Sequence, residues 1–291
     1  MSNVECKVKK PISPFRKIAI GTWQTAYDPS IYGTLRLNMD KAVEYIEKFR
    51  QVKGKKLTVT HLVAKAVALA LKACPDANAV LRWNRIYLRK NIDISLLVLI
   101  KSGDHMDLSA VKLEKVDETS LETMVSILDN HVAKIRDRKD KALEKTRKSM
   151  LRIPFFFINF FLKMLSFFAY TLNWNMEKFG VPKDAFGGAI VTSIGSIGLD
   201  IGYVPIVPYS RVPIYAAPGE IHPEPVVLPD GTLGVAQIMN LNATFDHRVV
   251  DGGHAAMLSK TIKEVFEDPF GKLDPLDEPT DDQGNTASLE S

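Results

Sequence analysis

The chain has 291 residues, of which 46% are apolar and 25% charged, a balance that excludes disordered and collagen-like proteins. Its formal net charge of +4 gives no indication of nucleic-acid binding, and its two cysteines, Cys6 and Cys74, match neither a disulfide framework nor a metal-ligand spacing. This cysteine usage fits a reducing, cytoplasmic setting, and residues 1–10 lack the apolar region of a secretory signal.

The first half of the chain shows regular apolar patterns after an irregular start. Residues 1–14 lack periodicity and contain two prolines, so we expect a flexible N-terminal arm there. Alternating or continuous apolar runs predict strands at residues 34–38, 85–88, 92–100 and 109–113. Apolar positions at helical spacing predict helices at residues 40–52, 59–73 and 117–138. The second helix contains His61, which we interpret as a buried or interface histidine with a structural role.

Residues 151–174 form an apolar block that holds seven phenylalanines and is long enough to cross a bilayer. Pro154 and Lys163 oppose a spanning helix, because a lysine near its centre is costly in hydrocarbon. We favour a helical hairpin that is buried or faces a partner. The next alternative is a segment on a membrane surface, assisted by the basic run before it, and the last is a spanning helix.

The remainder of the chain is rich in predicted strands. These strands cover residues 188–194, 212–217, 233–239 and 241–245, and a helix follows at 253–267. Because strands and helices interleave, the sequence predicts one α/β (α+β) layered domain over residues 15–272, with a mixed sheet flanked by helices. The acidic residues 273–291 are predicted to be a disordered tail.

The segment after the last predicted strand carries the chemical signal. His247 and Asp251 are four residues apart, and Gly252 and Gly253 follow where the strand gives way to a helix. A rigid scaffold aims functional groups at such strand ends, and a neutral imidazole is suited to taking a proton from a thiol at neutral pH. By spacing alone, a surface histidine capped by an aspartate remains an equal alternative.

The residues from Asp246 to Gly253, which read DHRVVDGG, resemble the active-site motif of dihydrolipoamide acyltransferases of the 2-oxo acid dehydrogenase complexes. A shorter form of that motif, His-x-x-x-Asp-Gly, is shared by the chloramphenicol acetyltransferases. Residues 75–78 resemble the family's Pro-x-x-Asn turn, and residues 187–198 resemble its glycine-rich strand and turn. The resemblance covers roughly residues 12–270 and implies a chloramphenicol acetyltransferase-like fold.

The resemblance also implies roles for four residues. His247 would be the general base that deprotonates a thiol, and the hydroxyl of Thr192 would donate to the tetrahedral oxyanion. Asp251 would be structural, held by a salt bridge to Arg16. The family is expected to form a homotrimer or a larger trimer-based assembly, with Thr192 of one subunit facing the His247 of a neighbour.

The sequence departs from the family in three places. We expect no lipoyl domain and no covalently bound lipoate, because few residues precede the catalytic region, so a lipoyl carrier protein would act in trans. The run 103–109, GDHMDLS, replaces a Gly-Leu-x-x-Pro-x-x run that contributes to the family's substrate channel. The apolar residues 151–175 are an expected insertion that resembles stand-alone members of the family.

The leading hypothesis is therefore a cytoplasmic acyltransferase, which moves an acyl group between a CoA or lipoyl thioester and a thiol or hydroxyl acceptor. Coenzyme A or acyl-CoA is its expected substrate, and neither a metal nor nucleic acid is expected. One alternative is a non-catalytic trimeric scaffold of the same fold, peripheral to the membrane through residues 151–174. A second alternative is a chloramphenicol-type O-acetyltransferase.

Overall fold

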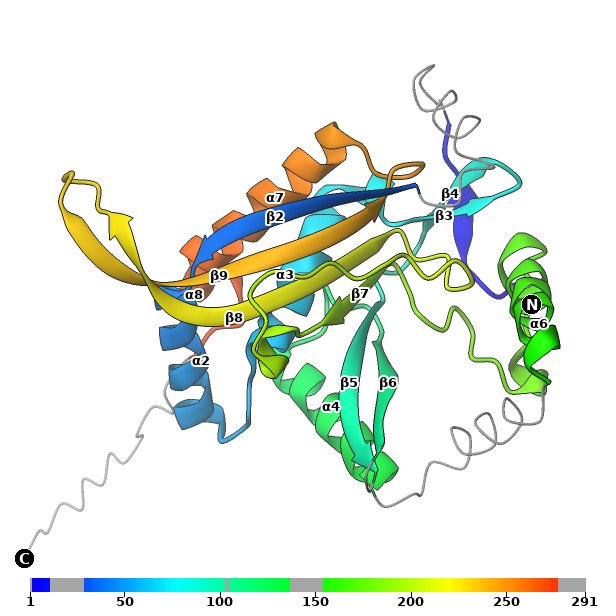
Figure 1. Ribbon diagram of the computed structural model, residues 1–291, viewed down its shortest axis with the longest axis horizontal. Helices are drawn as coiled ribbons and strands as arrows, with labels where there is room; N and C mark the ends of the chain where they lie inside the picture. The colour runs from blue at the N-terminus through cyan, green and yellow to red at the C-terminus, as the bar shows by residue number, and fades with distance from the viewer. Residues whose placement is uncertain (1, 11–28, 103–104, 137–153, 277–291) are drawn as a thin grey trace, which may run out of the picture.

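A six-stranded mixed sheet forms the centre of the computed structural model, which describes residues 2–10, 29–102, 105–136 and 154–276 (Figure 1). In sheet order the strands are β2 (Ser30–Asn38), β9 (Leu233–Asp246), β8 (Ile214–Val227), β7 (Ala189–Thr192), β5 (Ile94–Ser102) and β6 (His105–Leu113). Strand β7 runs parallel to both of its neighbours, and the other pairs are antiparallel. The predicted mixed sheet is confirmed.

Helices cover one face of this sheet and close a single large core (Figure 1). They are α2 (Asp40–Lys53), α3 (Val59–Ala73), α4 (Leu121–Arg136), α7 (Gly252–Glu267) and the short α8 (Pro269–Lys272). Helix α3 has the predicted bounds, and ten of its residues are buried because it lies between the sheet and other helices. Its first turn is closed by a capping box, in which Thr58 and His61 satisfy each other's backbone N–H groups.

A second, three-stranded sheet lies beside the first and is built from β1 (Cys6–Val8), β4 (Arg85–Arg89) and β3 (Ala79–Arg82). The start of the chain therefore differs from the expected loose arm over residues 2–10. Asn3 and Val4 are buried, and the side chain of Asn173 bonds to both the N–H and the carbonyl of Val4. These contacts fix the segment, whereas residues 11–14 and Arg16 lie outside the described residues.

The apolar block contains one α-helix, α6 (Phe155–Ser166), which continues into a π-helical turn, η2 (Phe167–Thr171). Ala169 and Tyr170 pack against the small sheet, whereas Phe157 and Phe160 are 50% and 62% exposed. The block is thus partly packed and partly exposed, its described residues form one helix instead of a hairpin, and a partner on the exposed side stays a prediction. Among the helices of the described ranges, none has the length and apolar character needed to cross a membrane.

Candidate active site

His247 lies in the turn that joins β9 to α7. Two contacts with the rest of the domain hold this turn in place. Val249 and Val250 are buried, and the N–H of His247 donates to the carbonyl of Pro29 at 3.0 Å. Within the turn, the carboxylate of Asp246 accepts two hydrogen bonds from the Arg248 guanidinium, at 2.9 and 2.6 Å. A two-bond pair of this kind holds its partners in one orientation. The sequence therefore presents His247 on a rigid support.

The ring of His247 is oriented by its own turn. Its Nδ1 lies 3.0 Å from the carbonyl oxygen of Val250. A carbonyl can only accept, so in the neutral imidazole Nδ1 carries the proton and Nε2 is the basic nitrogen. This is the tautomer that a histidine needs in order to take a proton from a substrate.

Asp251 begins helix α7 as its N-cap. Its Oδ1 accepts from the N–H of His254 at 3.1 Å, and the Nδ1 of His254 lies 2.7 Å from the same oxygen. An N-cap aspartate of this kind stabilises a helix by about 1 kcal/mol. The expected salt bridge from Asp251 to Arg16 falls outside the described residues and stays a prediction.

Thr192 ends strand β7 and lines a different part of the molecule. It borders a cavity of about 700 Å³ whose wall also includes Arg50, Lys56, His61 and Asp129. The chain after Thr192 is held by close backbone packing, since a Cβ at Gly195 would lie 2.3 Å from the carbonyl oxygen of Gly219. Only a glycine allows this approach, which ties the turn after Thr192 to strand β8.

Strand register places His247 and Thr192 towards opposite ends of the strands, β9 and β7, that lead to them. Val191 is level with Ala216, and Ala216 is level with Ala243. His247 lies four residues beyond Ala243, whereas Thr192 lies one residue beyond Val191 in the opposite direction, a separation of roughly 15 Å along the strands. Strand β8 also lies between their strands. The structure does not bring the two side chains of one chain together.

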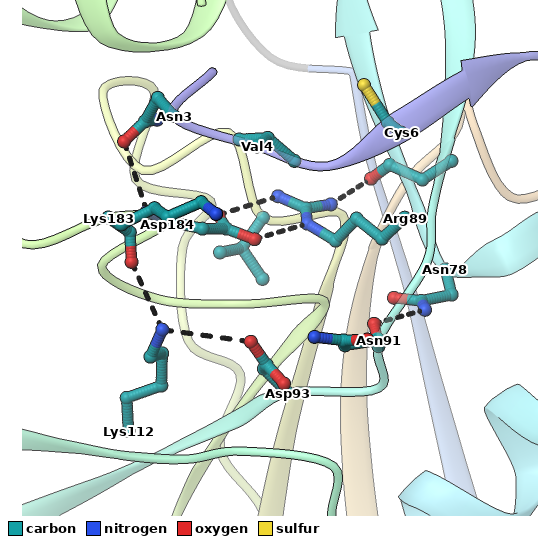
Figure 2. A network of polar contacts seen from close by, with 12 residues as sticks. Asn3, Val4, Cys6, Asn78, Arg89, Asn91, Asp93, Lys112, Lys183 and Asp184 are labelled. Carbon is teal, nitrogen blue, oxygen red and sulfur yellow. Dashed lines mark hydrogen bonds and ion pairs between the residues drawn. The ribbon is translucent and has the colours of Figure 1, made fainter. Parts of the chain in front are cut away.

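A buried polar network connects the two sheets (Figure 2). The Arg89 guanidinium donates to Asp184 at 3.1 Å and to the carbonyl of Ala79, and the N–H of Asp184 donates to the Asn3 side chain. Lys112 donates to the carbonyl of Lys183 and lies 3.7 Å from Asp93, whose carboxyl pKa is raised by burial. Each charged side chain in this network has a partner of opposite charge. Through Asn3 the network joins the N-terminal segment to the rest of the domain.

A group of positively charged side chains next to the His247 turn was not predicted from the sequence. Arg211 and Arg248 line a cavity of about 680 Å³ beneath helix α6, together with Lys163. Arg211 stands in a loop without a motif, so the sequence carries no signal for it. Across the described residues, no group of three or more His, Cys, Asp or Glu side chains is placed to hold a metal ion.

Residues 6–150 and 181–273 match the family model described as 2-oxoacid dehydrogenases acyltransferase (catalytic domain). A curated relative, the dihydrolipoyllysine-residue acetyltransferase component of the Zymomonas mobilis pyruvate dehydrogenase complex, is 23% identical over 249 residues, or 84% of this chain. The cubic core of the pyruvate dehydrogenase multienzyme complex superposes with a TM-score of 0.61 at 19% identity, covering 91% of this chain and 93% of that one. A chloramphenicol acetyltransferase superposes with a TM-score of 0.50 at 12% identity, covering 90% and 100%. These likenesses confirm the predicted fold.

The matches cover part of the relatives' length and part of this chain. The chain spans about half the length of the curated relatives it matches, 46% of the Zymomonas protein. The family match also leaves out residues 151–180, which contain α6 and the π-helical turn. The cavity lined by Lys163, Arg211 and Arg248 thus lies partly within residues that the family match leaves out.

Proposed function

Because the chain belongs to the family of 2-oxoacid dehydrogenase acyltransferase catalytic domains, we propose that it transfers an acyl group between a CoA thioester and a thiol. The observation that carries this proposal is the turn at His247, in which the Val250 carbonyl leaves Nε2 as the basic nitrogen. In the transfer, Nε2 takes the proton of the incoming thiol as its sulfur attacks the thioester carbonyl carbon. Collapse of the tetrahedral intermediate expels the other thiolate, which recovers the proton.

The negative oxygen of that intermediate needs a hydrogen-bond donor, and we assign this role to the Thr192 hydroxyl. Since His247 and Thr192 lie towards opposite ends of the strands of one sheet, the proposed site forms between subunits. The cavity beside Thr192 would receive one reactant from a neighbouring chain, with the Lys56 ammonium available to the phosphates of CoA, whereas the Arg50 guanidinium already donates to the carbonyl of Leu57 through two nitrogens. A homotrimer or a larger trimer-based assembly supplies the required repeated interface.

The first experiment measures acyl transfer from acetyl-CoA to free dihydrolipoamide, with the acetylated product detected by mass spectrometry. His247→Ala should lower the rate by about 10²–10⁴-fold, because proton removal from the thiol is lost. His222→Ala is the matched control, since His222 is a partly exposed histidine in β8 that pairs with Glu224. Full activity in His247→Ala would refute the base assignment, and no transfer by the unaltered chain would favour a non-catalytic scaffold.

A second experiment tests the shared site. Thr192→Val and His247→Ala chains are each nearly inactive in the proposal, but a co-assembled equal mixture contains interfaces with one intact His247 and one intact Thr192. Random pairing restores roughly a quarter of the normal sites. An inactive mixture that is nevertheless shown to co-assemble would contradict the intersubunit site. A lipoyl domain of another protein, offered in place of dihydrolipoamide, tests whether a carrier acts in trans.

A further inference from the structure

The cavity beneath helix α6 combines apolar walls with basic side chains. Phe160, Leu162, Met164 and Phe167 of the helical block face Pro208 and Tyr209 of the loop before β8, and the space between them is about 680 Å³. A volume of this size lies within the range of about 300–1,000 Å³ that small-molecule sites occupy. Phe160 and Tyr209 are exposed, so the cavity is open to solvent.

Three basic residues line this cavity, Lys163, Arg211 and Arg248, and no acidic residue is among its described lining. Arg248 is neutralised by its two bonds to Asp246. Arg211 has no carboxylate within salt-bridge distance in the described part of the chain, and its Nε donates to the Ser166 hydroxyl at 3.0 Å. Burial, and then the charge of Arg248, lower the pKa of the Arg211 guanidinium, and the charge of Asp246 opposes this shift.

The arrangement of Arg211 defines the shape of a fitting ligand. Because Nε is occupied by Ser166, the two terminal nitrogens are left to face one anionic group, and a guanidinium binds a carboxylate through two parallel bonds. The aromatic and aliphatic walls would receive an apolar chain attached to that group. An uncharged apolar molecule would leave the guanidinium without an anion.

We propose that the cavity between α6 and the loop before β8 binds an apolar carboxylate, with the carboxylate on Arg211 and the chain against Phe160 and Phe167. The site lies largely within residues that the family match omits. It is separate from proton transfer at His247, so His247→Ala should leave this binding intact even if the proposed acyl transfer were refuted.

The test compares decanoate with decanol by isothermal titration calorimetry on the full chain at neutral pH. We expect decanoate to bind about tenfold more tightly than decanol, and Arg211→Gln to bring the two affinities together. Arg36→Gln is the matched control, because Arg36 is an exposed arginine of β2 that pairs with Glu224 and lies outside this cavity. Equal affinity for the two ligands in the unaltered chain, or full decanoate affinity in Arg211→Gln, would overturn the proposal.

A second variant keeps the test decisive if Arg211→Gln does not fold. Phe160 is 62% exposed, so Phe160→Ser preserves the core while removing an apolar wall. It should weaken decanoate and decanol by a similar factor of about three to ten. Unchanged binding of both ligands would place them elsewhere, and sedimentation with anionic vesicles in the absence of decanoate binding would assign the aromatic surface to lipid instead. Either result contradicts the proposal.

Discussion

Arg89 and Arg211 are both withdrawn from solvent, but their surroundings differ. Arg89 is 2% exposed at its side chain and meets Asp184 and the carbonyl of Ala79 (Figure 2). Arg211 is anchored by the Ser166 hydroxyl and borders an open cavity in whose lining the described residues include no carboxylate. The first arginine has its counter-charge within the fold, whereas the second has room for a counter-charge from outside. Arg89 therefore supports folding, whereas Arg211 is the group proposed to bind an anion.

The largest effect is expected when the paired arginine is removed. Arg89→Met should lower the free energy of unfolding by about 3–5 kcal/mol, because it leaves the Asp184 carboxylate buried without its partner. Urea titration followed by circular dichroism measures this change. The comparison fails if the loss is below about 1 kcal/mol.

The pairing itself is tested by a double variant. Adding Asp184→Asn to Arg89→Met should recover part of the lost stability, because the carboxylate that lost its partner is no longer charged. The same urea titration applies, with Asp184→Asn alone as the control. Strictly additive losses would mean that the ion pair contributes little.

His61 is a buried imidazole in which one ring nitrogen has a hydrogen-bond partner among the described residues and the other has none. Its Nδ1 contacts Thr58, whereas its buried Nε2 has no hydrogen-bond partner in the described structure. Burial lowers its pKa to about 4, against the opposing effect of Asp129. The unfolded chain therefore binds more protons between pH 6.5 and 4, so stability should fall by up to about 3 kcal/mol as the pH drops through this range.

Urea titrations at several pH values measure that loss. His61→Gln is the matched variant, because glutamine retains the capping partner of Thr58 but does not titrate. Its stability should fall less steeply with acid than that of the unaltered chain. Identical slopes would show that other groups cause the acid sensitivity.

Removing the unpaired arginine should have a smaller effect on folding. Arg211→Met is expected to change the free energy of unfolding by less than about 1 kcal/mol, because one hydrogen bond to Ser166 is lost while a partly buried charge close to Arg248 is removed. The measurement is the urea titration used for Arg89→Met. A loss as large as that of Arg89→Met would mean that Arg211 serves the fold instead of a ligand.

The smallest effect concerns the anchor of Arg211. Ser166→Ala should reduce decanoate affinity by about threefold, because the guanidinium loses the contact that orients it. Decanol affinity should stay constant in the same calorimetric experiment. Equal losses for both ligands would indicate a change in the apolar wall.

Long elements with their own hydrophobic pattern were predictable from sequence, and short ones were not. Helix α3 has the predicted bounds, whereas β9 is one strand where two were predicted. The predicted interruption falls near Asn240, whose side-chain amide instead donates to the carboxylate of Asp200, in the segment between β7 and β8. Strands β1 and β3 have three and four residues, and each pairs only with β4 within the described sheet; β3 does so across a turn at Trp83 and Asn84, whose φ angles are positive.

In the candidate site, too, residues in a local motif were predictable and a residue held by a distant contact was not. His247 and Asp251 are predictable because their motif is contiguous, and the turn that holds them is local. The catalytic roles of His247, Thr192, Asp251 and Arg16 stay predictions. Arg211 could not be predicted, since Ser166 is 45 residues away and only the fold brings them together.

Because His247 and Thr192 lie towards opposite ends of the strands of one sheet, the proposed activity would depend on the concentration of the chain. On the proposed arrangement, a solitary chain holds two half-sites and no complete one. Turnover per chain would then fall on dilution, even with saturating substrates, once subunits separate. The concentration of complete sites would therefore rise more steeply than the concentration of chains.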